Sequence, residues 1–164
     1  MQAPLKNVLY CTDLSQNSYI AFGYAAYLAK LTGADLHLIH VLEPLSDDAV
    51  FAFQTFVQDA SKRREMLDTR AQKAREVIDE RQDTFWAAQS AEDQKVRNQV
   101  KSITVCESNP AEQIIKSAEE HNCDLIVMGS HEGSIGHIFL GSVARKVLHR
   151  SKIPSLVVPL PDAD

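Results

Sequence analysis

The sequence has 164 residues, of which 45% are hydrophobic and 24% charged, as is typical of one soluble globular domain. The formal net charge of -5 argues against nucleic-acid binding through a basic face, but it allows a small anion held by backbone amides. No apolar run approaches the roughly 20 residues that span a bilayer, and the N-terminal MQAPLKNVLY lacks the apolar core of a secretory signal. We therefore expect one cytoplasmic domain over residues 1–164, with no membrane or nucleic-acid partner.

The first 44 residues predict a strand, a helix and a second strand. NVLYC (7–11) is a short apolar run and is followed by the polar turn TDLSQNS. Apolar residues then recur at helical spacing from Tyr19 to Leu31, up to Gly33. ADLHLIHVLEP (34–44) predicts the second strand, which Pro44 ends. Two strands joined by a helix with short connections form the βαβ unit of a parallel sheet.

Residues 45–100 form a long, partly helical middle segment. An apolar patch lies at 51–57, and dense alternating charge follows from about Asp59 to Arg81. Apolar residues recur there at steps of three or four, which predicts an amphipathic helix with a narrow apolar stripe. Residues 85–100 are expected to continue it as helix or helical extension.

The strand–helix alternation resumes after residue 100. KSITVCESNP predicts a third strand, and Asn109 with Pro110 forms the N-cap and first position of a helix. CDLIVMG predicts a central fourth strand that ends at Met128; GSVARKVLHRSK predicts a helix and IPSLVVP the last strand. This order predicts an α/β fold: a doubly wound, five-stranded parallel sheet with helices on both faces.

Four glycines separate the fourth strand from the last helix: Gly129, Gly133, Gly136 and Gly141. Glycines let backbone amides converge on one point, and the N-terminus of the helix from Ser142 adds free amides and partial positive charge. Together these features favour an anion site suited to phosphate. An ordinary flexible turn explains the glycine spacing equally well.

Asp13 follows the first strand, at the edge of the sheet where such folds bind ligands. Its carboxylate could accept hydrogen bonds from a ribose hydroxyl or an adenine amino group, or hold a metal ion. It could also cap a helix that begins near Ser15, and the sequence TDLS favours this cap. Both roles stay open, because they exclude each other only if one side chain has to fill both at once.

The cysteines and histidines carry no catalytic or metal prediction. Three cysteines (Cys11, Cys106 and Cys123) fit neither a CxxC pair nor a zinc site, so we expect buried, reduced thiols. His37 and His40 are expected to point the same way from the second strand and to line the core or a site rather than to bind a metal. We predict no catalytic residues and no direct metal site, although Glu43 and Glu107 could hold Mg²⁺ or Mn²⁺ through phosphates.

Two long stretches of the sequence together resemble the universal stress protein family. They are NVLYCTDLSQNSYIAFGYAAYLAKLTGADLHLIHVLEP (7–44) and DLIVMGSHEGSIGHIFLGSVARKVLHRSKIPSLVVP (124–159). The resemblance covers nearly the whole chain and is weakest over 45–100. It implies strand order 3-2-1-4-5, binding of ATP or AMP, and a homodimer paired through the last strand, at Ser155, Leu156, Val157 and Val158.

The resemblance also implies a set of binding residues. Thr12 and Asp13 match positions that contact adenosine, and Val41 matches the position that lines the adenine slot. Met128 and Gly129 match the start of the phosphate loop, and Gly141, Ser142 and Val143 match its end. Apart from the resemblance, Gly133 and Gly136 could supply the turn between them if Glu132 points outward, and we hypothesise that His131 contacts a phosphate.

The sequence departs from the family pattern in the glycine loop. Nucleotide-binding members read G-x2-G-x9-G-[ST], but here Glu132 stands at the second glycine and the loop is one residue short. A carboxylate facing a triphosphate would repel it by ~1 kcal/mol or more, unless Glu132 points outward. A second departure is Cys11, where the family often has proline.

The sequence therefore predicts a cytoplasmic homodimer that binds an adenine nucleotide as a signalling or regulatory module in the stress response. The short loop and Glu132 favour an alternative: a nucleotide-free dimer of the same family that binds an unknown protein partner. Any ATP hydrolysis would be slow. An adenylate-forming enzyme is the least favoured reading, because residues 129–141 contain no lysine or arginine to meet the phosphates.

Overall fold

The computed structural model describes residues 5–133, 137–138 and 140–161, and only the backbone of 131–133 and 137–138. Five parallel strands lie side by side in the order β3 (Val100–Glu107), β2 (Asp35–Leu42), β1 (Asn7–Cys11), β4 (Leu125–Gly133) and β6 (Ser155–Leu160). A two-residue strand, β5 (His137–Ile138), pairs antiparallel with the far end of β4. Counting the five parallel strands along the chain, the order is 3-2-1-4-5, which confirms the expected doubly wound sheet.

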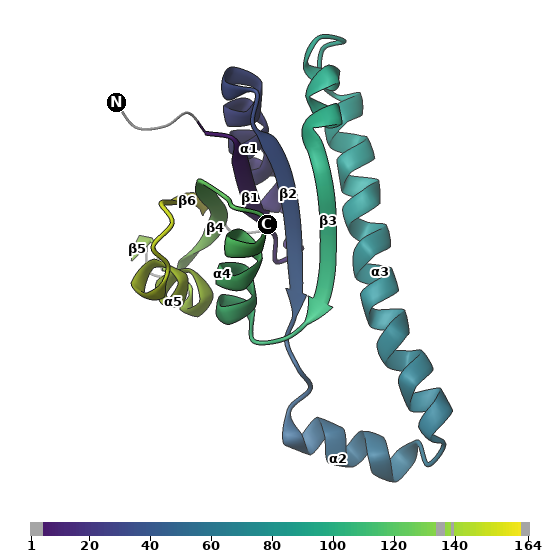
Figure 1. Ribbon diagram of the computed structural model, residues 1–164. Coiled ribbons are helices and arrows are strands. Elements are labelled where there is room, and N and C mark those ends of the chain that lie inside the picture. Colours follow the sequence, from purple (N-terminus) through teal and green to yellow (C-terminus); the bar gives the residue numbers. More distant parts are fainter. Residues whose placement is uncertain (1–4, 134–136, 139, 162–164) are drawn as a thin grey trace.

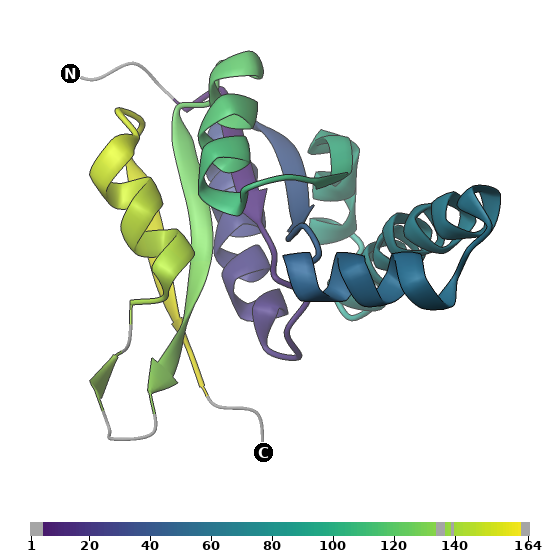
Figure 2. The same ribbon diagram turned by 90° about the horizontal axis from the view of Figure 1, so that it is seen from below.

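Helices cover both faces of this sheet (Figures 1 and 2). α1 (Ser18–Thr32) and α3 (Ala60–Ala87) pack on one face, and α4 (Pro110–Glu120) and α5 (Ser142–Arg150) pack on the other. Side chains alternate along a strand, so Val8 and Tyr10 join the first core cluster while Leu9 and Cys11 join the second. β1 is thus buried on both faces, which explains its unbroken apolar sequence.

The helix ends follow local capping chemistry. The Asn109 side chain accepts a hydrogen bond from the Glu112 amide at 3.3 Å and Pro110 opens α4, as predicted. α1 ends at Gly33, whose φ of 74° lies in the left-handed region that glycine tolerates best. α1 begins at Ser18 rather than near Ser15, and its N-cap is Asn17.

The middle segment contains two helices and a 3₁₀ helix. α2 (Asp47–Phe56) begins at the N-cap Ser46, whose side chain accepts from the Ala49 amide, and a 3₁₀ helix spans Asp93–Gln99. α3 confirms the predicted amphipathic helix. Its buried residues recur every four positions in its second half and are Ala74, Ile78, Gln82 and Trp86. This stripe fixes the second half of α3 to the sheet, whereas α2 buries none of its residues.

β4 corrects the predicted end of the fourth strand. The strand continues past Met128 to Gly133 because it pairs with β6 as far as His131 and with β5 at Glu132 and Gly133. Gly129 and Gly133 therefore belong to a strand and not to a loop. A Cβ atom on Gly129 would overlap the Leu160 side chain of β6, so glycine at this position allows the two strands to pack closely.

None of the helices in the described parts of the chain has both the length and the apolar character needed to cross a membrane.

Candidate functional site

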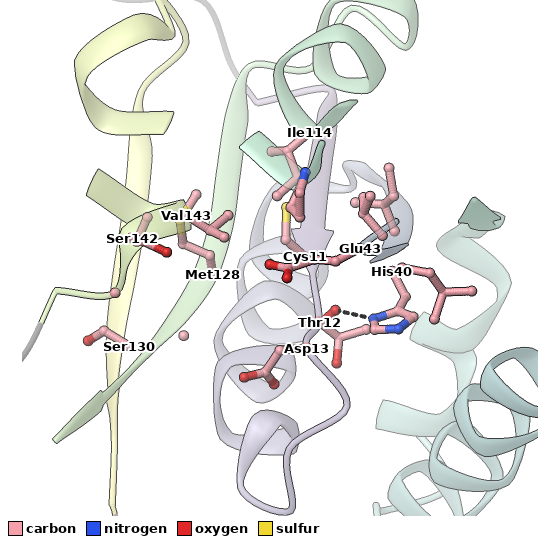
Figure 3. Close-up of a pocket in the computed structure, with 17 residues that line it drawn as sticks. Cys11, Thr12, Asp13, His40, Glu43, Ile114, Met128, Ser130, Ser142 and Val143 are labelled. Atoms are coloured by element: carbon pink, nitrogen blue, oxygen red, sulfur yellow. Dashed lines mark hydrogen bonds between the residues drawn. The ribbon is translucent and has the colours of Figure 1, made fainter. Parts of the chain in front are cut away.

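A cavity of about 500 Å³ opens at the carboxyl ends of β1, β2 and β4, beside the first turns of α4 and α5 (Figure 3). This volume lies within the range of small-molecule sites, roughly 300–1,000 Å³, and the position is where doubly wound sheets bind ligands. The lining residues are Cys11, Thr12, Asp13, Ile39, His40, Val41, Leu42, Glu43, Pro110, Ile114, Met128, Gly129, Ser130, Gly141, Ser142, Val143 and Ala144.

Much of the cavity wall is apolar. Ile39 and Val41 of β2, Met128 of β4 and Ile114 of α4 line it. Val41 packs against the core cluster beneath α4 and α5, and the other three belong to that cluster. Cys11 lies among them, and burial raises the pKa of its thiol well above the ordinary value. The thiol therefore stays protonated at neutral pH and behaves as a small apolar group. Such a wall suits a flat, largely apolar ring.

The chain turns sharply after β1 and places two polar residues at the cavity. The Thr12 amide donates to the Ile39 carbonyl at 3.0 Å, and Thr12 Oγ1 accepts from the Leu14 amide at 3.1 Å. Asp13 Oδ1 accepts from the Ser15 amide at 2.8 Å, and Leu14 has a left-handed φ of 61°. The predicted helix cap at Asp13 is thus wrong, because its carboxylate bonds within the turn before α1.

The two histidines of β2 face opposite ways. His40 lines the cavity, and its Nδ1 donates to the Thr12 carbonyl at 2.8 Å, since a carbonyl oxygen can only accept. His37 Nδ1 lies 2.7 Å from Ser102 Oγ, and its ring lies 4.3 Å from that of His121. The prediction that both point the same way is wrong, because a spacing of three places strand side chains on opposite faces.

The first turn of α5 offers backbone amides to the cavity. Gly141 is the N-cap and makes no side-chain capping bond, and Ser142 and Val143 open the helix. Amides at such a helix start attract anions. Nearby, Ser130 is only 2% exposed, and its hydroxyl has no hydrogen-bond partner in the part of the chain that the structure describes. A buried, unpaired hydroxyl at a cavity wall is costly unless a ligand or water pairs with it.

Eight of the eleven predicted binding residues line this one cavity: Thr12, Asp13, Val41, Met128, Gly129, Gly141, Ser142 and Val143. Gly133 is in β4 beyond the lining residues. Gly136 lies outside the described residues, and so do the side chains of His131 and Glu132. The structure therefore does not test the predicted contact of His131 with a phosphate.

Several lining residues were not expected from the sequence, among them Ile114 and Ser130, whereas His40 lines the site as one of its two expected placements. Ile114 comes from α4, one turn after Pro110, and only the packing of α4 on the sheet brings it to the cavity. For Ser130 a signal existed, because it directly follows Gly129 at the carboxyl end of a predicted strand.

The charges at the cavity are acidic. Asp13 and Glu43 line it, and no lysine or arginine does so within the described residues. No three histidine, cysteine, aspartate or glutamate side chains gather into a metal site in that same portion of the chain. The amides of α5 are therefore the groups at this cavity that can meet an anion, and a cation would have to come with the ligand or from beyond the cavity wall.

The sequence model of the universal stress protein family matches residues 4–159. The chain belongs to the universal stress protein family. Universal stress protein MJ0577 of Methanocaldococcus jannaschii is 28% identical over 159 residues, which is 96% of this chain and 97% of that protein. The Thermus aquaticus universal stress protein in the QAH/OAS sulfhydrylase 3'region is 30% identical over 162 residues, covering 93% and 98%.

Solved structures of universal stress proteins share the fold. The MJ0577 structure superposes with a TM-score of 0.70 at 24% identity and covers 98% of this chain and 100% of that one. A universal stress protein in complex with cAMP superposes with a TM-score of 0.52 at 20% identity, covering 96% and 98%. The first comparison supports the doubly wound fold, and the second shows a universal stress protein with a bound adenine nucleotide.

Proposed function

We propose that this universal stress protein binds an adenine nucleotide, ATP or AMP, in the cavity between β1, β2, β4 and the starts of α4 and α5. The observation that carries the proposal is the pairing of an apolar wall with an anion site in one cavity of about 500 Å³. Val41, Ile114 and Met128 would hold the adenine ring, and Asp13 would meet the ribose. The complex of a similar protein with cAMP supports an adenine nucleotide as the ligand class.

The phosphate end of the site would be built by α5. Its first-turn amides at Ser142 and Val143 would receive the first phosphate, and the buried Ser130 hydroxyl would gain the partner it lacks among the described residues. Asp13 and Glu43 would repel further phosphates, so we propose that Mg²⁺ or Mn²⁺ accompanies a polyphosphate. We propose that binding acts as a signal in the stress response rather than as a step of fast hydrolysis.

We propose that two copies pair through β6, in the cytoplasm. In the described part of the fold β6 pairs with β4 alone, so one edge of Ser155–Leu160 presents unpaired backbone groups. Such edges are ready to pair with a second strand. Pairing of Ser155, Leu156, Val157 and Val158 across a two-fold axis would extend the sheet into the second copy.

One specific observation favours the alternative function, a nucleotide-free module that binds a protein partner. β4 continues as strand through Gly133, so the first residues expected to cradle phosphate are paired in a sheet. The exposed aromatic side chains of α2, Phe51 at 72% and Phe56 at 85%, offer such a partner an apolar surface.

A ligand titration separates the two functions. Thermal unfolding would be followed by circular dichroism with ATP, AMP or inorganic triphosphate, each with Mg²⁺. Ligand at about 100 times its dissociation constant adds about 2.7 kcal/mol to the unfolding free energy, so ATP and AMP are expected to raise the unfolding temperature. Absence of any shift at millimolar ATP would favour the protein-partner function.

A variant at the helix start tests the placement of the phosphates. Ser142→Asp puts a carboxylate at the first position of α5, where it favours the helix but repels phosphate. We expect this variant to fold and to lose the stabilisation by ATP. Ala60→Asp makes the same change at the first position of α3, away from the cavity, and should keep the wild-type response. Equal responses of both variants to ATP would contradict the placement.

A further inference from the structure

A second hollow of about 290 Å³ adjoins the cavity. It shares Glu43, Pro110, Ser142 and Val143 with the cavity, so the two meet at the first turn of α5. Its other lining residues are Pro44, Asn109, Ala111 and Lys146. A ligand that reaches the start of α5 from the cavity can therefore extend into this hollow.

Lys146 is the only cation among the described residues that line the cavity and the hollow. It lies four residues after Ser142 on α5, so both side chains project from the same face of the helix. Side chains in a helix tilt towards its N-terminus, and this tilt directs the Lys146 ammonium towards the amides of the first turn. Lys146 is exposed and forms no hydrogen bond or ion pair with a described residue, which leaves its charge available to a ligand.

Lys146 shares the hollow with one carboxylate, that of Glu43. Among the described residues that line the hollow, Glu43 carries a negative charge and Lys146 a positive one. Glu43 and Lys146 both line the hollow but form no ion pair within 4.0 Å in the described structure. The buried Ser130 hydroxyl, 2% exposed and without a described partner, independently indicates a polar ligand atom in the cavity that this hollow adjoins.

We propose that the second hollow receives the outer phosphates of a nucleoside polyphosphate. Lys146 is the residue that makes the protein bind such a nucleotide more tightly than adenosine. This inference rests on the proposed nucleotide binding and adds its selectivity for phosphate number. The α5 amides bind the first phosphate, and Lys146, one turn further along the helix, binds the next. Its charge offsets the repulsion from Glu43, which otherwise makes the hollow unfavourable for an anion.

Calorimetric titration with adenosine, AMP and ATP tests the proposal on the wild type, Lys146→Gln and Arg145→Gln. Lys146→Gln is expected to lower the affinity for ATP about tenfold, which corresponds to about 1.4 kcal/mol. The affinity for adenosine should stay unchanged. Arg145 is the matched control, because it is exposed on the same helix and lines neither space. Arg145→Gln removes the same charge and should change ATP affinity less than twofold. Lys146→Arg should retain most of the ATP affinity.

The outcomes separate this proposal from the nucleotide site on which it rests. If the wild type binds adenosine and ATP but Lys146→Gln weakens both equally, or weakens ATP no more than Arg145→Gln does, then Lys146 does not select for phosphate number. If the wild type binds neither adenosine nor ATP, the proposed nucleotide function itself fails, and this inference fails with it. Raising the salt concentration should reduce the difference between wild type and Lys146→Gln, because screening weakens an exposed ion pair.

Discussion

The sheet and the α2 helix use similar residues in different ways. β1 and β2 bury apolar side chains on both faces, and Leu9, Leu36 and Leu38 are at most 1% exposed. α2 also carries aromatic residues at helical spacing, but none of its side chains is buried. Figure 1 shows α2 beyond the carboxyl end of the sheet, joined to the first half of α3.

This difference shows what holds each region. The strands are fixed by contacts from both core clusters, whereas α2 has its N-cap bond at Ser46 and its connection to α3. A helix of about ten residues is marginal in water without tertiary packing. The stability of the fold should therefore depend on the sheet and the second half of α3, and α2 should tolerate substitution unless a second protein covers it.

The largest expected effect is on assembly. Val157→Asp puts a charge on the β6 edge and is expected to convert the proposed dimer to a monomer in sedimentation velocity. Phe56→Asp makes a comparable change on α2 and should leave the dimer intact, since the interface is proposed to lie on the sheet. If Phe56→Asp is a monomer and Val157→Asp remains a dimer, the interface lies on α2 instead.

The next effect is on stability. Trp86 is 3% exposed, packs edge-on against Phe22 at 5.7 Å, and donates a hydrogen bond to Gln82. Trp86→Ala should cost about 3–5 kcal/mol of unfolding free energy, as is usual for a large buried aromatic side chain. Phe56→Ala should change it by less than about 0.5 kcal/mol. Urea denaturation measures both, and a comparable loss in the two variants would mean that α2 is packed in solution.

The smallest expected effect is pH dependence within the sheet. Burial, and then the neighbouring His121, lower the pKa of His37 below its ordinary value. The unfolded chain, with a histidine pKa of about 6.5, therefore binds the proton more readily than the folded protein does. Stability should fall as the pH drops below that value towards the lowered pKa of the folded state.

The His37→Asn variant checks this expectation. The urea midpoint of this variant should change less between pH 7 and pH 5 than that of the wild type, because the variant lacks the proton that the unfolded chain takes up at His37. His149→Asn is the control, because His149 is exposed on α5. If His37→Asn has the same pH dependence as the wild type, then groups other than His37 cause the loss of stability at low pH.

The fold could be predicted well where local signals agree with the topology. Apolar runs bounded by turn residues located β1, β2 and β6, and the Asn109–Pro110 pair located the start of α4. The end of β4 could not be predicted, because glycine usually ends a strand. Here Gly129 instead makes room for Leu160 of the neighbouring strand, 31 residues later in the sequence, and such a contact leaves no local signal.

The residues of the site that lie at the ends of strands could be predicted from the sequence. The position after the first strand predicts Asp13, and the resemblance to the family predicts Thr12 and Val41; all three line the cavity. Ile114 and Lys146 come from helices, and their approach depends on how α4 and α5 pack on the sheet. The helix spacing of Lys146 and Ser142 was present in the sequence, but only the adjoining hollow gives it meaning.

The central claim is that the cavity binds an adenine nucleotide, and a crystal structure grown with ATP and Mg²⁺ tests it most directly. We expect adenine against Val41 and Ile114, ribose at Asp13, and a phosphate on the amides of Ser142 and Val143. A well-ordered crystal in which this cavity holds no nucleotide at saturating ATP, or in which ATP lies elsewhere on the protein, would contradict it.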